Sequence, residues 1–285
     1  MLRWLSGRGA PQRKVEQELA LLTDEVWHRA IVSHPFLVGL TPDEDLALQQ
    51  RTAWILASKQ FSGVQGLELT HEIMLSVAIQ AALPIMQLSP RLYEGWTEII
   101  MYPSGFVIPR TEVDESGVVH EYMMEASGEA WDGGPLILSW EDAEAGLVSR
   151  ANVVIHEFAH KLDLYGSDAD GMPSLGAHPD IHPHEWQRIL QASFDEFCAS
   201  LAAAEDAIPS YIDPESAEAQ PWYASLPLDA YAATDLAEYF AVSTEVFFVD
   251  PAPLAQGLPQ WYALLARYYR QDPYRRMSLF HAKGS

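Results

Sequence analysis

The sequence predicts an α+β fold, and two observations lead to this prediction. Segments with helical spacing occur both before residue 84 and after residue 150. Between them, over about 97–140, short β-branched and aromatic runs such as EIIMY and PLILSW alternate with Gly, Pro and Asp, which is typical of short strands and turns. Helices before and after one strand-rich region indicate a small mixed sheet flanked by helices.

The helices of the first part have clear start signals. Thr41, Pro42 and Glu44 form a capping box with proline at the first helical position, so a helix is expected over about 42–58. A second helix should start near Thr70 and end at Pro84. Later periodicity predicts four helices, and a Pro- and acid-rich connection over about 203–228. The helices are expected at 150–164, 184–202, 228–248 and 258–270.

Composition limits the classes of protein to consider. The 285 residues are 48% hydrophobic, so the chain can bury a substantial core, and we expect one domain over 1–285. Its cleft is expected between a helical and sheet part at about 12–149 and a helical part at about 150–275. Forty acidic against seventeen basic residues give a net charge of −23, which disfavours nucleic acid and anionic membranes as partners.

Cysteine content and hydropathy indicate the compartment. Cys198 is the only cysteine, which rules out an intramolecular disulfide and a thiolate zinc cluster and predicts a buried structural residue. The basic N-terminal stretch MLRWLSGRGAPQRK has no apolar run of seven residues, and no apolar span reaches eighteen. The sequence therefore predicts a soluble, cytoplasmic protein.

The strongest chemical motif is HEFAH, which starts at His156. On a helix, His156 and His160 lie one turn apart on the face opposite an apolar stripe of Val154, Ile155, Phe158 and Leu162. Two imidazoles at this spacing can bind one zinc ion, while the intervening Glu157 can accept a proton from a water that zinc has made acidic. The alternative is two histidines with hydrogen bonds at a helix surface.

A catalytic zinc ion usually has three protein ligands, so a third must lie elsewhere in the chain. The metzincin motif is excluded, because Asp163 and Gly166 occupy the positions where it requires glycine and histidine. Glu185 lies a little far downstream for a short-spaced third ligand. Glu238 is the stronger candidate, because Tyr231, Glu238 and Glu245 recur every seven residues in an apolar helical pattern, and a buried carboxylate is costly unless it is paired or binds metal. For Glu245 an ion pair or helix cap is favoured over ligation.

The segments HEFAHKLDLYGSDADGMPSL, AEYFAVSTEVFF and GEAWDGGPLILSW together resemble the Mlc titration factor A family of bacterial zinc metallopeptidases, over about residues 25–275. The resemblance implies a zincin-like fold of the gluzincin type, with a catalytic core similar to that of anthrax lethal factor. It implies aminopeptidase activity on small peptides, with zinc bound by His156, His160 and Glu238, Glu157 as the general base and Tyr231 as transition-state stabiliser. In enterobacteria the family binds and inactivates the repressor Mlc, which affects sugar uptake, so the resemblance also implies a repressor partner.

Physical reasoning adds to these roles and leaves alternatives. On one helical face with Glu238, the Tyr231 hydroxyl could stabilise an oxyanion, although a packed tyrosine with a satisfied hydroxyl also fits. Asp163 could accept the second N–H of a ligand imidazole, or could simply be solvated. The alternative to a zinc peptidase is a regulatory binding protein with a structural or vestigial zinc site.

Other polar segments favour structural roles. In SDADG, the positions that an EF-hand loop fills with carboxylates hold Gly166 and Ala177, so Asp168 and Asp170 are interpreted as turn residues. The histidines of AHPDIHPHEW suit a loop or helix start, and the arginines of ARYYRQDPYRR suit intramolecular salt bridges. The strand GGPLILSW could be an open edge that pairs with a peptide, with glycines 133 and 134 allowing close backbone approach, or an ordinary interior strand.

Overall fold

The helices and strands follow the mixed order that the sequence predicts. The computed structural model describes residues 12–113, 119–147, 150–165 and 168–284, so the first eleven residues of the basic N-terminal stretch lie outside the described residues. The elements up to residue 145 are α1 (Gln12–Leu21), α2 (Asp24–Val32), α3 (Pro42–Ser58), β1 (Gln60–Gly63), α4 (His71–Ala82), β2 (Glu98–Tyr102), β3 (Phe106–Val113), β4 (Val119–Ala126), β5 (Gly128–Ala130), β6 (Leu136–Ser139) and α5 (Trp140–Ala145).

The two helices expected in the first part are confirmed. Helix α3 begins with the predicted capping box, in which the Glu44 N–H donates to the Thr41 hydroxyl oxygen at 3.3 Å and the Thr41 N–H donates to the Glu44 carboxylate at 2.8 Å. The Thr70 hydroxyl accepts the N–H of Ile73 and starts α4. Helices α1 and α2, which contact α3 and α4 respectively, were not predicted.

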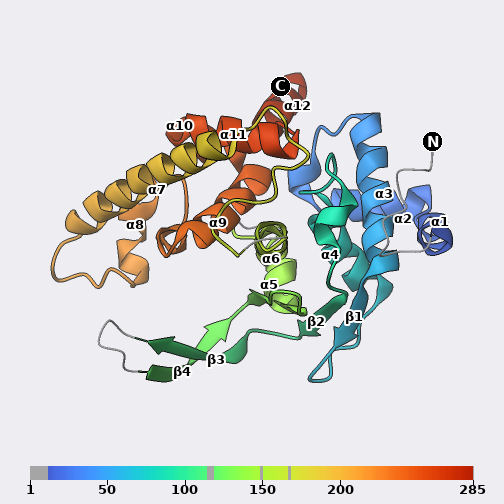
Figure 1. Ribbon diagram of the computed structural model, residues 1–285, viewed down its shortest axis with the longest axis horizontal. Helices are drawn as coiled ribbons and strands as arrows, with labels where there is room; N and C mark the ends of the chain where they lie inside the picture. The colour runs from blue at the N-terminus through green and yellow to red at the C-terminus, as the bar shows by residue number, and fades with distance from the viewer. Residues whose placement is uncertain (1–11, 114–118, 148–149, 166–167, 285) are drawn as a thin grey trace.

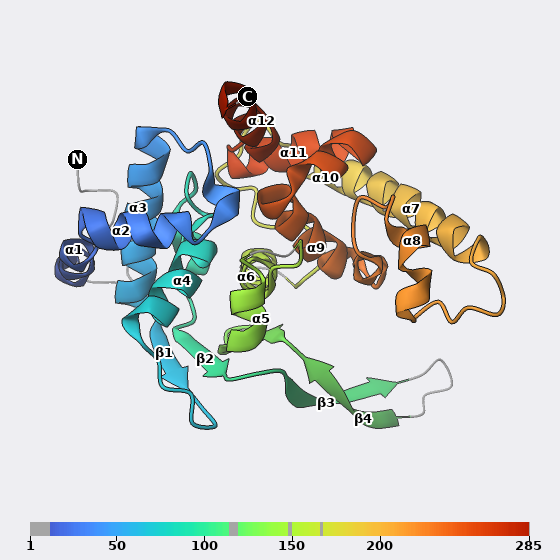
Figure 2. The same cartoon turned by 180° about the vertical axis from the view of Figure 1, so that it is seen from behind.

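The strands form a four-stranded mixed sheet in the order β1-β2-β6-β5, with β5 antiparallel to β6 and the other pairs parallel. Strand β1 follows α3 directly and lies outside the stretch where strands were expected. Strands β3 and β4 make a separate two-stranded hairpin that projects from the rest of the molecule (Figures 1 and 2).

The proposal that GGPLILSW forms an open edge is wrong. Its strand β6 lies between β2 and β5, so both of its sides are paired and the interior alternative holds. The open edge on this side of the sheet is the three-residue strand β5. Gly133 and Gly134 form the turn between β5 and β6, where Gly133 has a φ of +58°. This turn needs glycine for its backbone conformation.

The second half is helical, and one expected helix is divided. Its elements are α6 (Val153–Asp163), α7 (Pro183–Asp206), α8 (Gln220–Tyr223), the 3₁₀ turn η5 (Ala230–Ala233), α9 (Leu236–Val249), α10 (Pro251–Gly257), α11 (Pro259–Tyr269) and α12 (Pro273–Gly284). The single helix predicted over 228–248 is wrong, because the side chain of Asp235 caps a new helix by accepting the N–H of Glu238 at 2.9 Å. Residues 230–233 therefore form a separate turn before α9.

Helix α6 lies at the centre of the molecule (Figure 1), where it contacts α9, β5 and β6. Its predicted apolar stripe is confirmed, because the four stripe residues are fully buried in the core. Phe158 from this stripe packs against Tyr93 and Trp96, with ring centroids 5.0 and 5.6 Å away. The stripe fixes the rotation of α6 and turns the histidine face toward α9. Among the described residues, no helix is long and apolar enough to cross a membrane.

Candidate metal centre

The start of α6 is fixed by a buried asparagine. The Asn152 side chain caps the helix by accepting the N–H of Ile155 at 2.9 Å. Its amide nitrogen donates to the Gln80 side chain on α4 at 2.7 Å and to the Gly146 carbonyl at 3.2 Å. Because all of this asparagine is buried, its hydrogen bonds hold the first turn of α6, and with it His156, in one place.

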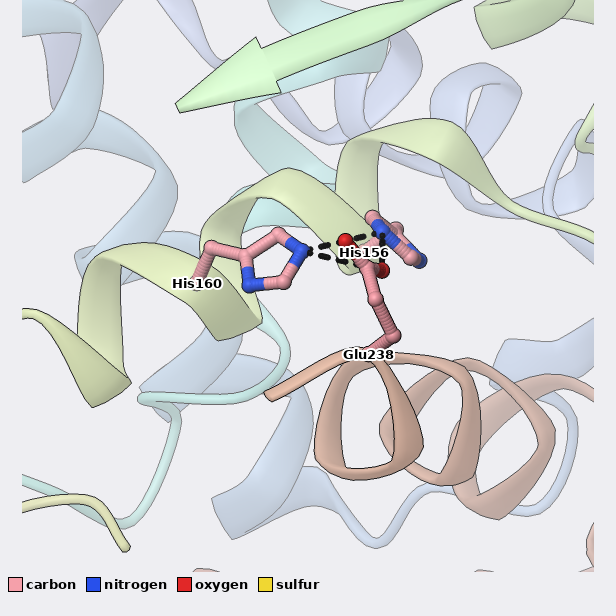
Figure 3. A group of neighbouring side chains, drawn as sticks. All are labelled: His156, His160 and Glu238. Atoms are coloured by element: carbon pink, nitrogen blue, oxygen red, sulfur yellow. Dashed lines mark hydrogen bonds and ion pairs between the residues drawn. The ribbon is translucent and has the colours of Figure 1, made fainter. Parts of the chain in front are cut away.

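The two histidines of HEFAH face one carboxylate on α9 (Figure 3). Oε2 of Glu238 lies 3.1 Å from Nε2 of His156 and 3.3 Å from Nε2 of His160. The two Nε2 atoms are 3.1 Å apart. Three ligand atoms placed tetrahedrally around zinc, with bonds of about 2.0–2.1 Å, would be about 3.3–3.4 Å apart. The three side chains therefore fit a zinc ion.

Glu245 lies seven residues after Glu238 on α9, and its carboxylate contacts the other ring nitrogen of His156. Its Oε1 lies 2.6 Å from Nδ1 of His156, and its Oε2 accepts the backbone N–H of Asn152 at 2.5 Å. A hydrogen bond from Nδ1–H to this carboxylate would leave Nε2 of a neutral His156 available to a metal ion in place of its proton. The ion pair expected for Glu245 is therefore confirmed, and its partner is a histidine of the motif.

The charges at the centre favour a cation there. Burial on its own lowers the pKa of His156, but the Glu245 and Glu238 carboxylates outweigh this and raise the pKa well above 6.5. Burial raises the pKa of Glu238, but hydrogen bonds from both imidazoles outweigh this and hold it well below its usual range. A positive charge between these groups is stabilised, and a metal ion can take the place of the protons.

The Glu157 side chain lies against strand β5 and lines the same pocket as His156, His160 and Glu238. It is 5% exposed, and its Oε2 has no hydrogen-bond partner among the described residues. Burial raises the pKa of this carboxyl group above its usual value, and this direction makes it a better proton acceptor. A Cβ atom on Gly128 of β5 would lie 2.5 Å from its Oε1, so the strand can pass this close only with glycine there.

Gly128 was missed in the sequence. Close backbone approach was expected at Gly133 and Gly134, whereas the residue against the carboxylate is the glycine that opens GEAWDGG. The available signal was a glycine within the strand-rich region, since a glycine inside a strand often marks such a close approach.

Tyr231 reaches the centre from η5, and its expected place two turns before Glu238 on one helix is wrong. The Asp229 side chain caps η5 by accepting the N–H of Tyr231 at 2.9 Å. The tyrosine ring centroid lies 6.2 Å from that of His156, and the side chain is about half exposed. Burial and then the nearby Glu238 carboxylate raise the pKa of its phenol, so the hydroxyl keeps its proton and can donate.

These side chains line a pocket of about 660 Å³. Its walls come from β5, from α6 and from the segment 231–245, and they include Glu129, Asp132 and Asp235. None of the described residues that line it is lysine or arginine. The pocket has room for a small ligand, and its acidic lining favours positive charge.

The remaining sequence candidates lie elsewhere or differ from expectation. Glu185 pairs with Arg267 on the surface at 2.6 Å, which confirms the expected intramolecular salt bridge for this arginine of the cluster. Asp163 is fully buried, so the solvated alternative is wrong, and its Oδ2 accepts the N–H of Gly171 at 2.8 Å. Cys198 is partly exposed on α7, so the expectation of a buried cysteine is also wrong.

Asp170, His178 and His182 have the structural roles expected for them. Asp170 accepts the N–H of Met172 at 3.0 Å in a turn. Buried His178 lies in a loop against Tyr268, and His182 directly precedes α7.

Comparison with known proteins establishes the family. The sequence profile described as glucose-regulated metallo-peptidase M90 matches residues 9–270. The chain belongs to the M90 metallopeptidase family. Two relatives, each named Mlc titration factor A, come from Yersinia pestis (strain Pestoides F) and Yersinia pseudotuberculosis serotype O:1b (strain IP 31758). Each is 33% identical over 279 residues, which cover 97% of this chain and 93% of the relative. Membership in the M90 family implies a metal ion, and the cluster of His156, His160 and Glu238 is where the described residues can hold one.

Proposed function

We propose that this M90 protein is a zinc-dependent peptidase of zincin-like fold, in which His156, His160 and Glu238 hold the metal ion and Glu157 is the general base. The observation that supports this most strongly is the meeting of three ligand atoms within 3.1–3.3 Å of one another at the wall of an open pocket. A site that served structure alone would have no need of adjoining space for a substrate. The proposal treats the chain as a single catalytic domain with this pocket as its cleft.

Each polar group has a place in peptide hydrolysis. Zinc, when bound, supplies a Lewis acid that polarises a carbonyl and lowers the pKa of water toward about 7. The buried Glu157 carboxylate accepts the proton of the attacking water and gives it to the leaving amine. The Tyr231 hydroxyl, which stays protonated, donates a hydrogen bond to the oxyanion that develops on the scissile carbonyl.

Strand β5 is the proposed binding edge for the peptide backbone. The Ser139 N–H donates to the Ser127 carbonyl, and the Trp131 N–H donates to the Pro135 carbonyl, so these odd-numbered residues of the β5 segment bond toward β6. Bonding direction alternates along an antiparallel strand, so Gly128 and Ala130 turn their N–H and C=O groups to the open side. An extended peptide can pair there without a strong sequence preference.

The acidic lining of the pocket supports an aminopeptidase. Glu129, Asp132 and Asp235 lie at its wall, where they favour the positive charge of a free N-terminal amine. We therefore propose action on the N-termini of small peptides. Cleavage of alanine p-nitroanilide, together with loss of cleavage when a peptide's N-terminus is acetylated, tests this specificity, and equal cleavage of acetylated peptides would indicate an endopeptidase instead.

The decisive test of the enzyme is Glu157→Gln. Because Glu157 handles protons and is not among the three clustered ligand residues, the variant should lose hydrolysis by about a thousandfold or more and keep about one zinc ion per chain. Glu141→Gln, at an exposed position on α5, is the control and should keep both. Loss of zinc together with activity would place Glu157 among the ligands and overturn the assignment.

The name of the relatives supports a second role. Both Yersinia relatives are named Mlc titration factor A, and they match nearly the whole chain. We propose that this protein also binds an Mlc-like repressor and so affects sugar uptake. A titration of purified repressor with wild type and with Glu157→Gln tests it: binding by both would separate this role from catalysis, and absence of binding by either would exclude the role.

A further inference from the structure

Lys161, the residue directly after the second histidine of HEFAH, is buried and contacts one turn of the chain. It is 3% exposed. Its Nζ donates to three backbone carbonyls, those of Trp131 at 2.6 Å, Gly134 at 3.0 Å and Pro135 at 3.4 Å. These carbonyls belong to the turn that joins β5 to β6. A single ammonium group therefore binds both ends of that turn.

The same face of α6 contacts β5 at a second point. Glu157 and Lys161 are four residues apart, so they lie one above the other along α6. Glu157 is covered by Gly128 at the start of β5, and Lys161 binds the turn that begins one residue after Ala130. Strand β5 has only three residues and is paired on one side alone. Its position over the pocket therefore depends on these two contacts and on its pairing with β6.

We propose that Lys161 is a positioning residue. It fixes β5 relative to α6, in the position where the open backbone edge of β5 can pair with a peptide. This rests on the proposed peptidase function. Lys161 touches no ligand atom of the metal centre; it acts through the turn and so through the backbone of Gly128 and Ala130. Three backbone acceptors on one turn give the ammonium group a defined geometry, and its removal would leave three carbonyls of the turn without this donor.

The chain offers a matched control in Lys59. This second lysine is also buried, at 6% exposure, and its Nζ also donates to backbone carbonyls, those of Tyr93 at 2.5 Å and Trp96 at 2.8 Å. Both lysines lie near the Trp96 ring, with Nζ 3.5 Å from the centroid for Lys59 and 4.7 Å for Lys161. Lys59 has no hydrogen bond to the β5–β6 turn. Loss of either ammonium group should lower the stability of the fold, but only the loss of Lys161 should affect β5.

The experiment compares Lys161→Met with Lys59→Met in the zinc-loaded protein. Lys161→Met should raise KM for a peptide by about tenfold or more, while kcat and the zinc content stay within about threefold, since the ligands and the base remain on α6 and α9. Hydrogen exchange at the amides of Trp131 and Gly134, both bonded within the turn, should become at least about tenfold faster. Lys59→Met should change neither KM nor this exchange.

Two outcomes for Lys161→Met would contradict its role in positioning β5. A KM for Lys161→Met no higher than that of Lys59→Met, or a fall in zinc content, would show a purely structural or ligand-linked role. If Lys161→Met does not fold, Lys161→Arg decides, because a guanidinium cannot place three bonds from one nitrogen and should raise KM by at least about threefold; an unchanged KM contradicts the proposal. If wild type cleaves no peptide, the peptidase function fails, and hydrogen exchange at the turn still tests the contact itself.

Discussion

The site combines side chains from two long helices with groups from two short segments, and the two halves differ in how they are held. His156, His160 and Glu238 come from α6 and α9, which pack against each other inside the core. Tyr231 comes from a four-residue 3₁₀ turn, and the open edge comes from the three-residue strand β5. The helical half can fix a metal ion, while the short segments face the pocket that a substrate would enter.

The two halves of the site are held by different sets of hydrogen bonds. The ligand half has a buried hydrogen-bond network beneath it, in which Glu245 links His156 to the backbone of Asn152. The substrate half is held in part by the cap of Asp229 on η5 and by the lysine on the β5–β6 turn. Changes in the first half should therefore alter zinc binding, and changes in the second should alter turnover or KM.

The largest effect is expected in the helical half, from Glu238→Ala. Two imidazoles alone hold zinc weakly and leave its charge less balanced, so zinc affinity should fall by about a thousandfold or more, and activity with it. The helix should survive, since alanine is a good helix former and the change removes a buried carboxylate. Competition with a chelator measures the affinity.

Glu185→Ala is the control for that experiment. Its carboxylate pairs with Arg267 at the surface, so zinc affinity should stay within about twofold of wild type. Equal losses in the two variants would contradict the assignment of Glu238, and a zinc-bound structure with Glu245 among the ligands would replace it.

Tyr231→Phe tests the short-segment half and should have a smaller effect. The hydroxyl acts on charge that develops in the transition state, so kcat should fall by about tenfold to a thousandfold while the zinc content stays unchanged. The ring remains and can keep its place beside His156. Steady-state kinetics with metal analysis measures this, and an unchanged kcat would leave Tyr231 with a packing role only.

The helical half could be predicted from the sequence because periodicity and caps are local signals. The stripe of α6 and the cap of Thr41 were visible in consecutive residues. A carboxylate in an apolar helix pointed to Glu238 because burial of an unpaired charge is costly. What could not be seen was the partner of Glu245, since an ion pair across 89 positions of sequence depends on how α6 and α9 pack.

The short segments were harder to predict because their structure depends on contacts distant in sequence. The pattern of every seventh residue placed Tyr231 on the helix of Glu238, but the Asp235 cap competes with helix continuation and divides the segment. The sequence left GGPLILSW either an edge or an interior strand, and pairing with β2 and β5 makes it interior. An apolar run cannot by itself show how many neighbours a strand has.

The smallest expected effect concerns the buried end of α6, which neither half of the site uses. Burial raises the pKa of Asp163 to about 7, and the hydrogen bond from the Gly171 N–H only partly offsets this. The folded protein therefore keeps a proton on Asp163 at a pH where the unfolded chain, with a pKa near 3.8, has released it. The folded state binds more protons between these values, so the free energy of unfolding falls as pH rises through about 7.

Asp163→Asn should remove this dependence, because asparagine cannot ionise and its side-chain oxygen can still accept the Gly171 N–H. Between about pH 5.5 and pH 7.5 the wild type should lose about 2 kcal/mol of unfolding free energy relative to the variant, since each pKa unit corresponds to about 1.36 kcal/mol. Urea unfolding of both metal-free proteins at the two pH values measures the difference. The histidines of the metal centre titrate in both proteins, so their contribution largely cancels. A constant difference between the proteins at both pH values would mean that Asp163 is already ionised in the folded state, held by charge compensation that outweighs its burial.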